Sequence, residues 1–239
     1  MNSLLSLSRR TVAIAIFTAL AACSKSPEAT DPKAAPVVST PAPAPANVPA
    51  GAYTLDKYHA SLIFRVNHLG FSRYTAKFAT FDAQLQFDPQ AFATSSIAAT
   101  VDAASLTLDN PPPGFTEELL NAQWLDAKQF PKMTYQSKKV EALSPTKARI
   151  TGDFTMHGIT KPLVLEAIFN GGYAGHPMDP HARIGFSAQG TLKRSEYGIA
   201  FGIPAPGTTM GVSDEVDIMI EAEFSGPPLA KSAETSETK

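Results

Sequence analysis

The chain has 239 residues, one cysteine and a formal net charge of −2 at pH 7, from 20 basic and 22 acidic residues. This near-balance excludes the strongly basic surface of a nucleic-acid-binding protein. A single cysteine excludes an intrachain disulfide, so the folded part must be held together by its apolar core.

The first 22 residues have the pattern of a lipoprotein signal peptide. Arg9 and Arg10 precede an apolar run that is shorter than the about 20 residues needed to cross a bilayer. The run ends in Leu20-Ala21-Ala22-Cys23, where small residues precede a cysteine at the expected cleavage point. We therefore predict lipidation of Cys23 by acyl chains such as palmitate. The protein is then expected on the periplasmic face of the envelope, at the outer membrane because serine follows Cys23.

Two further segments lack the periodic apolar positions of a folded domain. Residues 23–50 are rich in alanine and proline, and residues 226–239 are mostly polar. Such segments bury too little apolar surface to offset the entropy lost on ordering, so we predict a disordered tether and a disordered tail. Residues 51–225, which remain, have the size of one domain.

Alternating apolar and polar residues predict about eight strands in this domain. The apolar face of the run 61–68 carries Leu62, Phe64, Val66 and His68. Similar runs are expected at 75–87, 97–104, 133–140, 148–155, 163–169, 184–194 and 216–224. Half-polar strands joined by short turns indicate an antiparallel sheet, closed into a barrel or folded as a sandwich. A single predicted helix, 116–125, would cap or plug the mouth of a barrel.

The apolar faces of these strands mix small side chains with aromatic ones. A barrel of about eight strands is either filled by side chains or holds one small ligand. Both remain open at this point, and we favour a cavity lined mostly by apolar groups. The wall residues predicted to bind a ligand are Leu62, Phe64, Val66, Phe81, Leu85, Phe186, Leu192 and Ile218.

Two ionisable residues lie at the ends of apolar stripes, His68 after the run 61–68 and Arg194 after the run 184–194. A buried arginine needs a partner, because an unpaired buried charge is too costly. We therefore predict that both residues bind the polar end of a ligand. The alternative is an internal role, with Arg194 paired to Asp82 or Glu196 and the histidine bonded to a backbone carbonyl.

Motifs of catalysis and metal binding are missing from the sequence. It has no glycine-rich phosphate loop, no paired-cysteine zinc spacing and no Gly-x-Ser-x-Gly elbow. His176, Asp179 and His181 share one loop, but an ordinary polar loop accounts for them better than a metal site. We predict no catalytic residue, no metal and no required cofactor.

A series of motifs in order resembles the YceI-like family of bacterial lipid- and polyisoprenoid-binding proteins. The matching stretches are 53–61, 64–70, 87–89, 124–126, 130–131, 152–162, 193–198 and 212–216. The resemblance implies a lipocalin-like antiparallel β-barrel whose apolar interior holds an isoprenoid chain, such as a polyprenyl phosphate or a quinone tail. It brings no catalytic residues. One departure is Pro113–Leu119, which stands where the family usually carries an Arg-Asp pair, and this leaves the head-group preference open.

The predicted function is therefore non-catalytic binding of an isoprenoid lipid or quinone, for carriage or sequestration in the envelope. The membrane is an expected partner through Cys23, a nucleic acid is not, and a homodimer is left open. Two alternatives remain: an envelope stress or interaction protein with a filled barrel, and an accessory to a quinone-linked redox enzyme.

Overall fold

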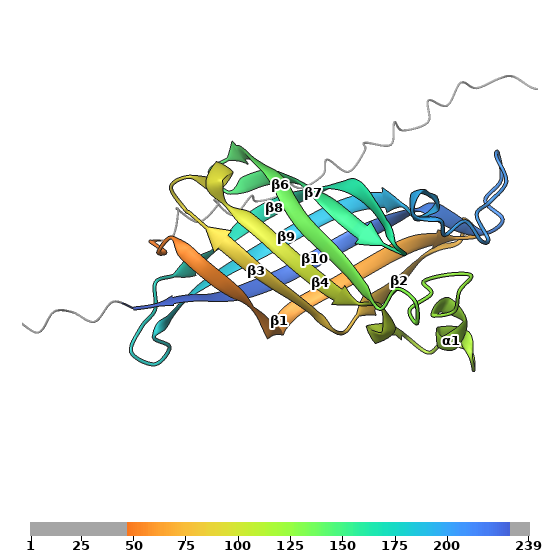
Figure 1. Cartoon of the computed structure of the whole chain (residues 1–239), viewed down its shortest axis with the longest axis horizontal. Helices are drawn as coiled ribbons and strands as arrows, with labels where there is room; N and C mark the ends of the chain where they lie inside the picture. Colours follow the sequence, from red (N-terminus) through yellow and green to blue (C-terminus); the bar gives the residue numbers. More distant parts are fainter. Residues whose placement is uncertain (1–46, 230–239) are drawn as a thin grey trace, which may run out of the picture. The chain divides into compact units, whose positions relative to one another are not determined.

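A computed structural model describes residues 47–229 of the chain; the predicted signal peptide, Cys23 and most of the predicted tether and tail lie outside these residues. The strands form one ten-stranded sheet in the order β10-β9-β8-β7-β6-β4-β3-β1-β2-β5, and β10 also pairs with β1. This last pairing closes eight strands into an antiparallel barrel (Figure 1), which confirms the predicted fold class.

The bounds of the elements follow the chain. The strands are β1 (Gly51–His68), β2 (Ser72–Phe78), β3 (Phe81–Phe87), β4 (Ser96–Asp102), β5 (Leu106–Leu108), β6 (Lys132–Ser144), β7 (Lys147–Met156), β8 (Ile159–Tyr173), β9 (His181–Lys193) and β10 (Val212–Pro228). The helical segments are η1 (Phe92–Thr94), η2 (Ala103–Ser105), α1 (Phe115–Leu119) and η3 (Arg194–Tyr197).

The predicted strand 75–87 is two strands in the structure. Both run antiparallel to β1, β3 beside its first residues and β2 beside its second half. Between them, the backbone N–H groups of Ala79 and Thr80 bond to the carbonyl and hydroxyl oxygens of Ser105, both at 3.0 Å. The interruption therefore comes from a contact with η2, a segment distant in sequence that local alternation cannot reveal.

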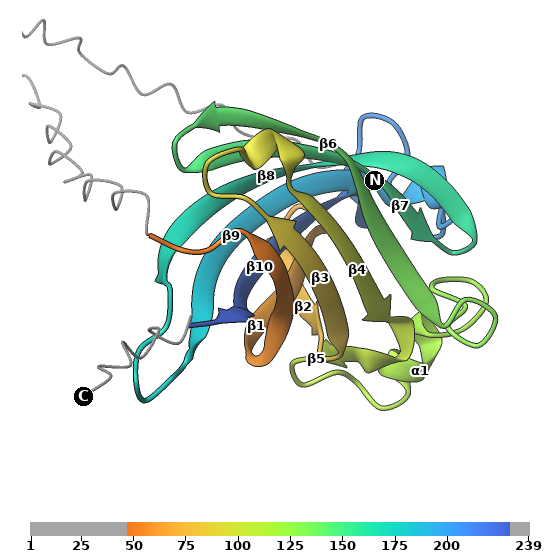
Figure 2. The same cartoon turned by 60° about the vertical axis from the view of Figure 1, so that its left-hand side comes forward.

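The predicted helix 116–125 is shorter than expected, because α1 ends at Leu119. The side chain of Asn121 accepts a hydrogen bond from the backbone N–H of Gln123 at 2.8 Å, and its carbonyl accepts one from Asp126 at 2.8 Å. Such local bonds compete with a helical ladder. The helix lies at the end of the barrel where β4 ends and β6 begins (Figure 2), as a cap would.

The folded part extends slightly beyond residues 51–225 at both ends. Val48 is 5% exposed and belongs to an apolar cluster that includes Tyr53, whose hydroxyl donates to the carbonyl of Pro49 at 2.7 Å. At the other end β10 runs on past residue 225, and a Cβ at Gly226 would lie 2.0 Å from the ring of Tyr53. Within residues 47–229, no helix has the length and hydropathy required to cross a membrane.

Candidate functional site: an apolar cavity in the barrel

The barrel contains a cavity of about 310 Å³, at the lower end of the about 300–1,000 Å³ typical of small-molecule sites. All ten strands contribute to its wall, and α1 and η1 add side chains as well. In the described part of the chain, the wall contains one charged residue, Arg194, and no histidine, cysteine or carboxylate. Such a wall suits the binding of an apolar chain better than acid–base chemistry.

Nine of the ten residues predicted to bind a ligand lie on this wall. They are Leu62, Phe64, Val66, Phe81, Leu85, Phe186, Leu192, Arg194 and Ile218. Strand alternation brings them together: Leu62 pairs with Ile220 across β1 and β10, and Phe64 pairs with Ile218. Their contact with a ligand stays a prediction.

His68 is the exception, because it is exposed and lies outside the cavity wall. The pairing of β1 with β10 shifts register between Val66 and His68, which lies opposite Val212. A register shift of this kind breaks the strict alternation on which the sequence-based prediction relied. The structure therefore does not place His68 beside Arg194 on the wall.

Arg194 borders the cavity and is only 5% exposed, but its guanidinium is engaged by the backbone. Nε donates to the carbonyl of Ser213 at 2.9 Å and Nη2 to that of Val212 at 2.8 Å. Nη1 donates to the carbonyls of Ile199 at 3.1 Å and Phe201 at 2.8 Å. Burial lowers the pKa of Arg194 and the nearby charge of Asp214 opposes this shift.

The internal role left open by the sequence is thus the one observed, with partners that differ from those expected. Four backbone carbonyls take the place of the expected carboxylates, and Asp82 pairs with Lys57 at 2.7 Å. Carbonyl dipoles compensate a buried guanidinium without adding a second charge. Most N–H donors of Arg194 are therefore engaged within the protein and are not free to bind a ligand.

Among the wall residues not predicted to bind a ligand are two aromatic ones that carry a hydrogen-bond donor, Tyr135 and Trp124. Tyr135 donates from its hydroxyl to the carbonyl of Ile150 at 3.1 Å, and burial raises the pKa of this phenol. Gly152 lies against its ring, where a Cβ would be 2.5 Å from Cζ. The inward position of Tyr135 follows from alternation in the run 133–140, so this residue could have been found.

Trp124, the second of these residues, lies in the turns after α1, where no periodicity exists to reveal it. Its ring meets that of Phe201 edge to face, with 5.4 Å between centroids. Its Nε1 is the only buried side-chain nitrogen or oxygen in residues 47–229 without a hydrogen-bond partner. A buried donor left unpaired costs about 1–3 kcal/mol.

The opposite end of the cavity carries a few hydroxyl groups, from Ser95, Ser96 and Thr146. They lie next to η1 and the turn between β6 and β7. Pairing of β4 with β6 begins only at Ala98 and Gln136, so the rest of β6 pairs with β7 alone. The barrel wall is therefore less continuous at this end.

Polar groups also gather on the outer face. The potential ligand atoms of Asp56, His59 and Glu223 lie close enough to share an ion. The carboxylate of Asp56, however, already accepts hydrogen bonds from Arg183 and from His59. In the loop that contains His176, the carboxylate of Asp179 accepts from the hydroxyl of Tyr173 at 2.7 Å and from Arg183 at 3.0 Å. In both places ion pairs within the protein engage the carboxylate.

Comparison with known proteins gives consistent matches over the barrel. A family model described as YceI-like domain matches residues 53–224. A UPF0312 protein of Vibrio cholerae is 33% identical over 165 residues, which cover 69% of this chain and 81% of that protein. A crystal structure of the Campylobacter jejuni YceI protein aligns with a TM-score of 0.57 at 28% identity, covering 67% of this chain and 89% of that one.

A structural neighbour from Saccharophagus degradans is described as a polyisoprenoid binding domain. It aligns with a TM-score of 0.55 and covers 73% of this chain and 98% of that one. Its sequence identity is 11%, so the likeness is one of fold.

Proposed function

Because the chain belongs to the YceI-like family, we propose that it binds one isoprenoid lipid inside its barrel and does not alter it chemically. The observation that carries this proposal is the apolar cavity of about 310 Å³. The polyisoprenoid-binding neighbour with the same fold supports the class of ligand. Affinity would come mainly from burying the chain, at about 25 cal/mol per Å² of apolar surface.

The charges of the wall favour a neutral chain over a charged head group inside the cavity. Arg194 is the only charged residue of the cavity wall in the described part of the chain, and its guanidinium already donates to four backbone carbonyls. A phosphate placed there would be a buried charge without a free cation, which is unfavourable. A phosphate-bearing ligand would therefore keep its head outside the cavity, whereas a neutral quinone ring would not meet this cost inside it.

We place this binding protein on the periplasmic face of the outer membrane, attached through acylated Cys23. This part of the proposal rests on the sequence Leu20-Ala21-Ala22-Cys23, which lies outside residues 47–229. Carriage or sequestration of an isoprenoid would suit such a location. Within this proposal a completely filled barrel is disfavoured, because the interior retains a cavity.

Lipid mass spectrometry on the full chain purified from its native envelope tests the proposed ligand. We expect an isoprenoid lipid in near-equimolar amount, and uptake of added polyprenol or quinone by protein from which it has been extracted. A chain that is always empty and takes up neither would contradict the proposal. A bound straight-chain fatty acid would change the ligand class.

A further inference from the structure

Two wall residues of the cavity, Ile199 and Val212, flank a loop that projects from one end of the barrel (Figure 1). The loop, residues 200–211, has the sequence AFGIPAPGTTMG and contains no charged side chain. Phe201 is 48% exposed and Met210 is 69% exposed. Large apolar side chains presented to solvent on an uncharged loop are typical of a docking surface.

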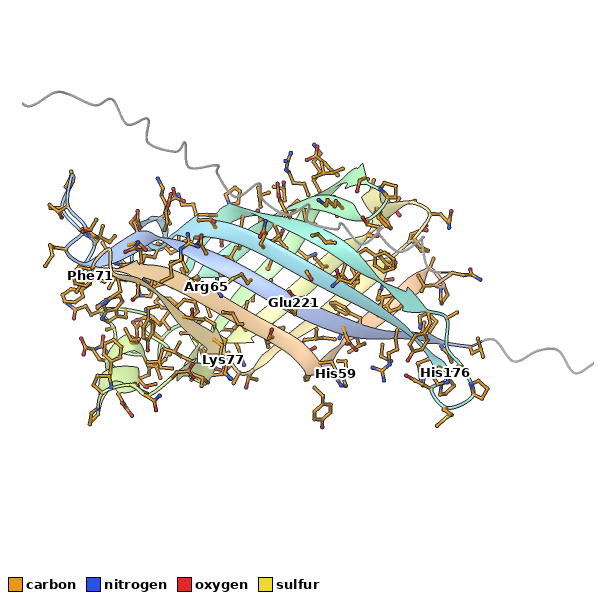
Figure 3. All side chains as sticks on the ribbon, turned by 180° about the vertical axis from the view of Figure 1, so that it is seen from behind. His59, Arg65, Phe71, Lys77, His176 and Glu221 are labelled. Carbon is orange, nitrogen blue, oxygen red and sulfur yellow. The ribbon has the colours of Figure 1, made fainter. Side chains whose placement is uncertain are left out.

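The turn between β1 and β2 lies against this loop and adds a third apolar side chain. The backbone N–H of Leu69 donates to the carbonyl of Gly211 at 2.8 Å. A Cβ at Gly70 would lie 3.0 Å from the hydroxyl of Thr209. The next residue, Phe71, is 82% exposed, and Figure 3 shows it beside the loop. We call residues 69–71 and 200–211 together the apolar tip.

The base of the apolar tip is firmly held. Arg194 bonds to the carbonyls of Ile199 and Phe201 at the start of the loop and to those of Val212 and Ser213 after its end. The backbone N–H of Val212 also donates to Gly202 at 2.8 Å. A clamped base lets exposed apolar side chains point into solvent without collapsing onto the barrel.

The apolar tip is continuous with the cavity. The ring of Phe201 packs on Trp124, whose side chain lines the cavity wall. Apolar contact therefore runs from half-exposed Phe201, within the apolar tip, to the place where a lipid chain would lie. Continuity of this kind is expected where an apolar ligand passes between its source and its site.

We propose that the apolar tip docks on a lipid bilayer, and that isoprenoid lipid passes between the bilayer and the cavity at this end. This inference rests on the proposed function and adds the surface from which the ligand comes. A bilayer suits the apolar tip because exposed aromatic and aliphatic side chains insert at the depth of the head groups, where an uncharged loop meets no electrostatic barrier. A protein partner would be expected to meet a polar rim, which this loop offers only through Thr208 and Thr209.

Cosedimentation with vesicles of phosphatidylethanolamine and phosphatidylglycerol tests the docking directly. The chain from position 23 onward is used with Cys23→Ser, so that no acyl chain contributes. Removing two side chains of the apolar tip by Phe71→Ser and Met210→Ser should weaken partitioning about tenfold or more.

The matched control is Tyr58→Ser with Met178→Ser. It removes an aromatic residue and a methionine that are 95% and 91% exposed, outside the apolar tip. Partitioning of this variant should be unchanged. Equal partitioning of all three proteins, or an equal loss in the control, would overturn the proposal.

Ligand uptake separates this inference from the proposed function. Polyprenol uptake from detergent micelles needs only the cavity, so the variant of the apolar tip should load normally from micelles and slowly from vesicles. Failure of every protein to load from micelles would count against the proposed function, while the vesicle assay would still decide whether the apolar tip docks. Equal loading rates from vesicles would contradict transfer through the apolar tip.

Discussion

The guanidinium carbon of Arg194 lies 5.2 Å from the centroid of the Trp124 ring, at the end of the cavity near α1. A cation over an aromatic face is attracted by the quadrupole of the ring, and burial strengthens the attraction. Together with the four carbonyls, this contact fixes the arginine as an internal support. The pair also joins η3, the turns after α1 and the 200–211 loop in one cluster.

The first prediction concerns this support. Arg194→Lys should lower the free energy of unfolding by about 3 kcal/mol. The compact ammonium of lysine lacks the planar, forked donors with which the guanidinium reaches four carbonyls, so some of these carbonyls lose their partner. Urea unfolding followed by circular dichroism measures the change. Arg73→Lys, at a side chain that is 69% exposed, is the control and should have little effect. Unchanged stability with lost ligand affinity would instead make Arg194 a ligand-binding residue.

The second prediction concerns the cavity and uses two neighbouring positions of β4. Ala99 lines the cavity and Ala98 does not. Ala99→Phe should occupy ligand volume and reduce uptake of a polyprenol about tenfold or more, at a modest cost in stability because space is available. Ala98→Phe should leave uptake unchanged. Binding titrations with a fluorescent polyprenol compare the two, and equal uptake would mean that the ligand lies elsewhere.

The third prediction concerns pH and the outer face. Asp56 lies where the pairing of β1 with β10 is irregular, and it binds Arg183 of β9. Hydrogen bonds from His59, which has the largest effect, and from Tyr58 and Arg183 lower the pKa of Asp56 to about 2, and the bond with Asp56 raises the pKa of His59. The contribution of Asp56 is therefore present above its ordinary pKa of 3.8 and is lost as the pH falls through about 2.

For His59 the sign is opposite. Its contribution is complete below the ordinary pKa of 6.5 and is lost as the pH rises through the raised value. For Asp56, the substitution Asp56→Asn should lower the free energy of unfolding by about 1 kcal/mol near pH 5. The difference from the unsubstituted protein should shrink as the pH falls toward about 2. Urea unfolding across this range measures it, with Asp82→Asn at an exposed pair as the control. A difference that does not vary with pH would contradict the assignment.

Local alternation predicted the inward positions of Leu62, Phe64 and Val66 because side chains alternate strictly along a regular strand. It was wrong at His68 because a register shift depends on the partner strand, which local sequence does not specify. It could not separate a barrel from a sandwich, because closure depends on the pairing of β1 with β10, residues far apart in the chain. The family resemblance supplied that choice.

The same limit applies to the polar groups. Alternation placed Arg194 inward, but its partners belong to an irregular segment whose carbonyl directions no sequence pattern encodes. Trp124 lies among turns that follow a shortened helix, so neither a period of two nor one of 3.6 residues applies to it. Ligand-facing residues on strands were therefore accessible to prediction, and those on loops were not.

The last prediction concerns the unpaired indole N–H of Trp124. Trp124→Phe removes this donor and keeps most of the ring against Phe201, so the packing loss is partly offset and stability should change by about 1 kcal/mol or less. Trp124→Ala removes the ring altogether and should lower the free energy of unfolding by about 3 kcal/mol or more. Unfolding monitored by circular dichroism compares the two without relying on the only tryptophan as a probe. If both substitutions proved equally destabilising, the indole N–H would have to be making a stabilising bond in solution, and an oxygen of a bound lipid would be the first candidate to examine.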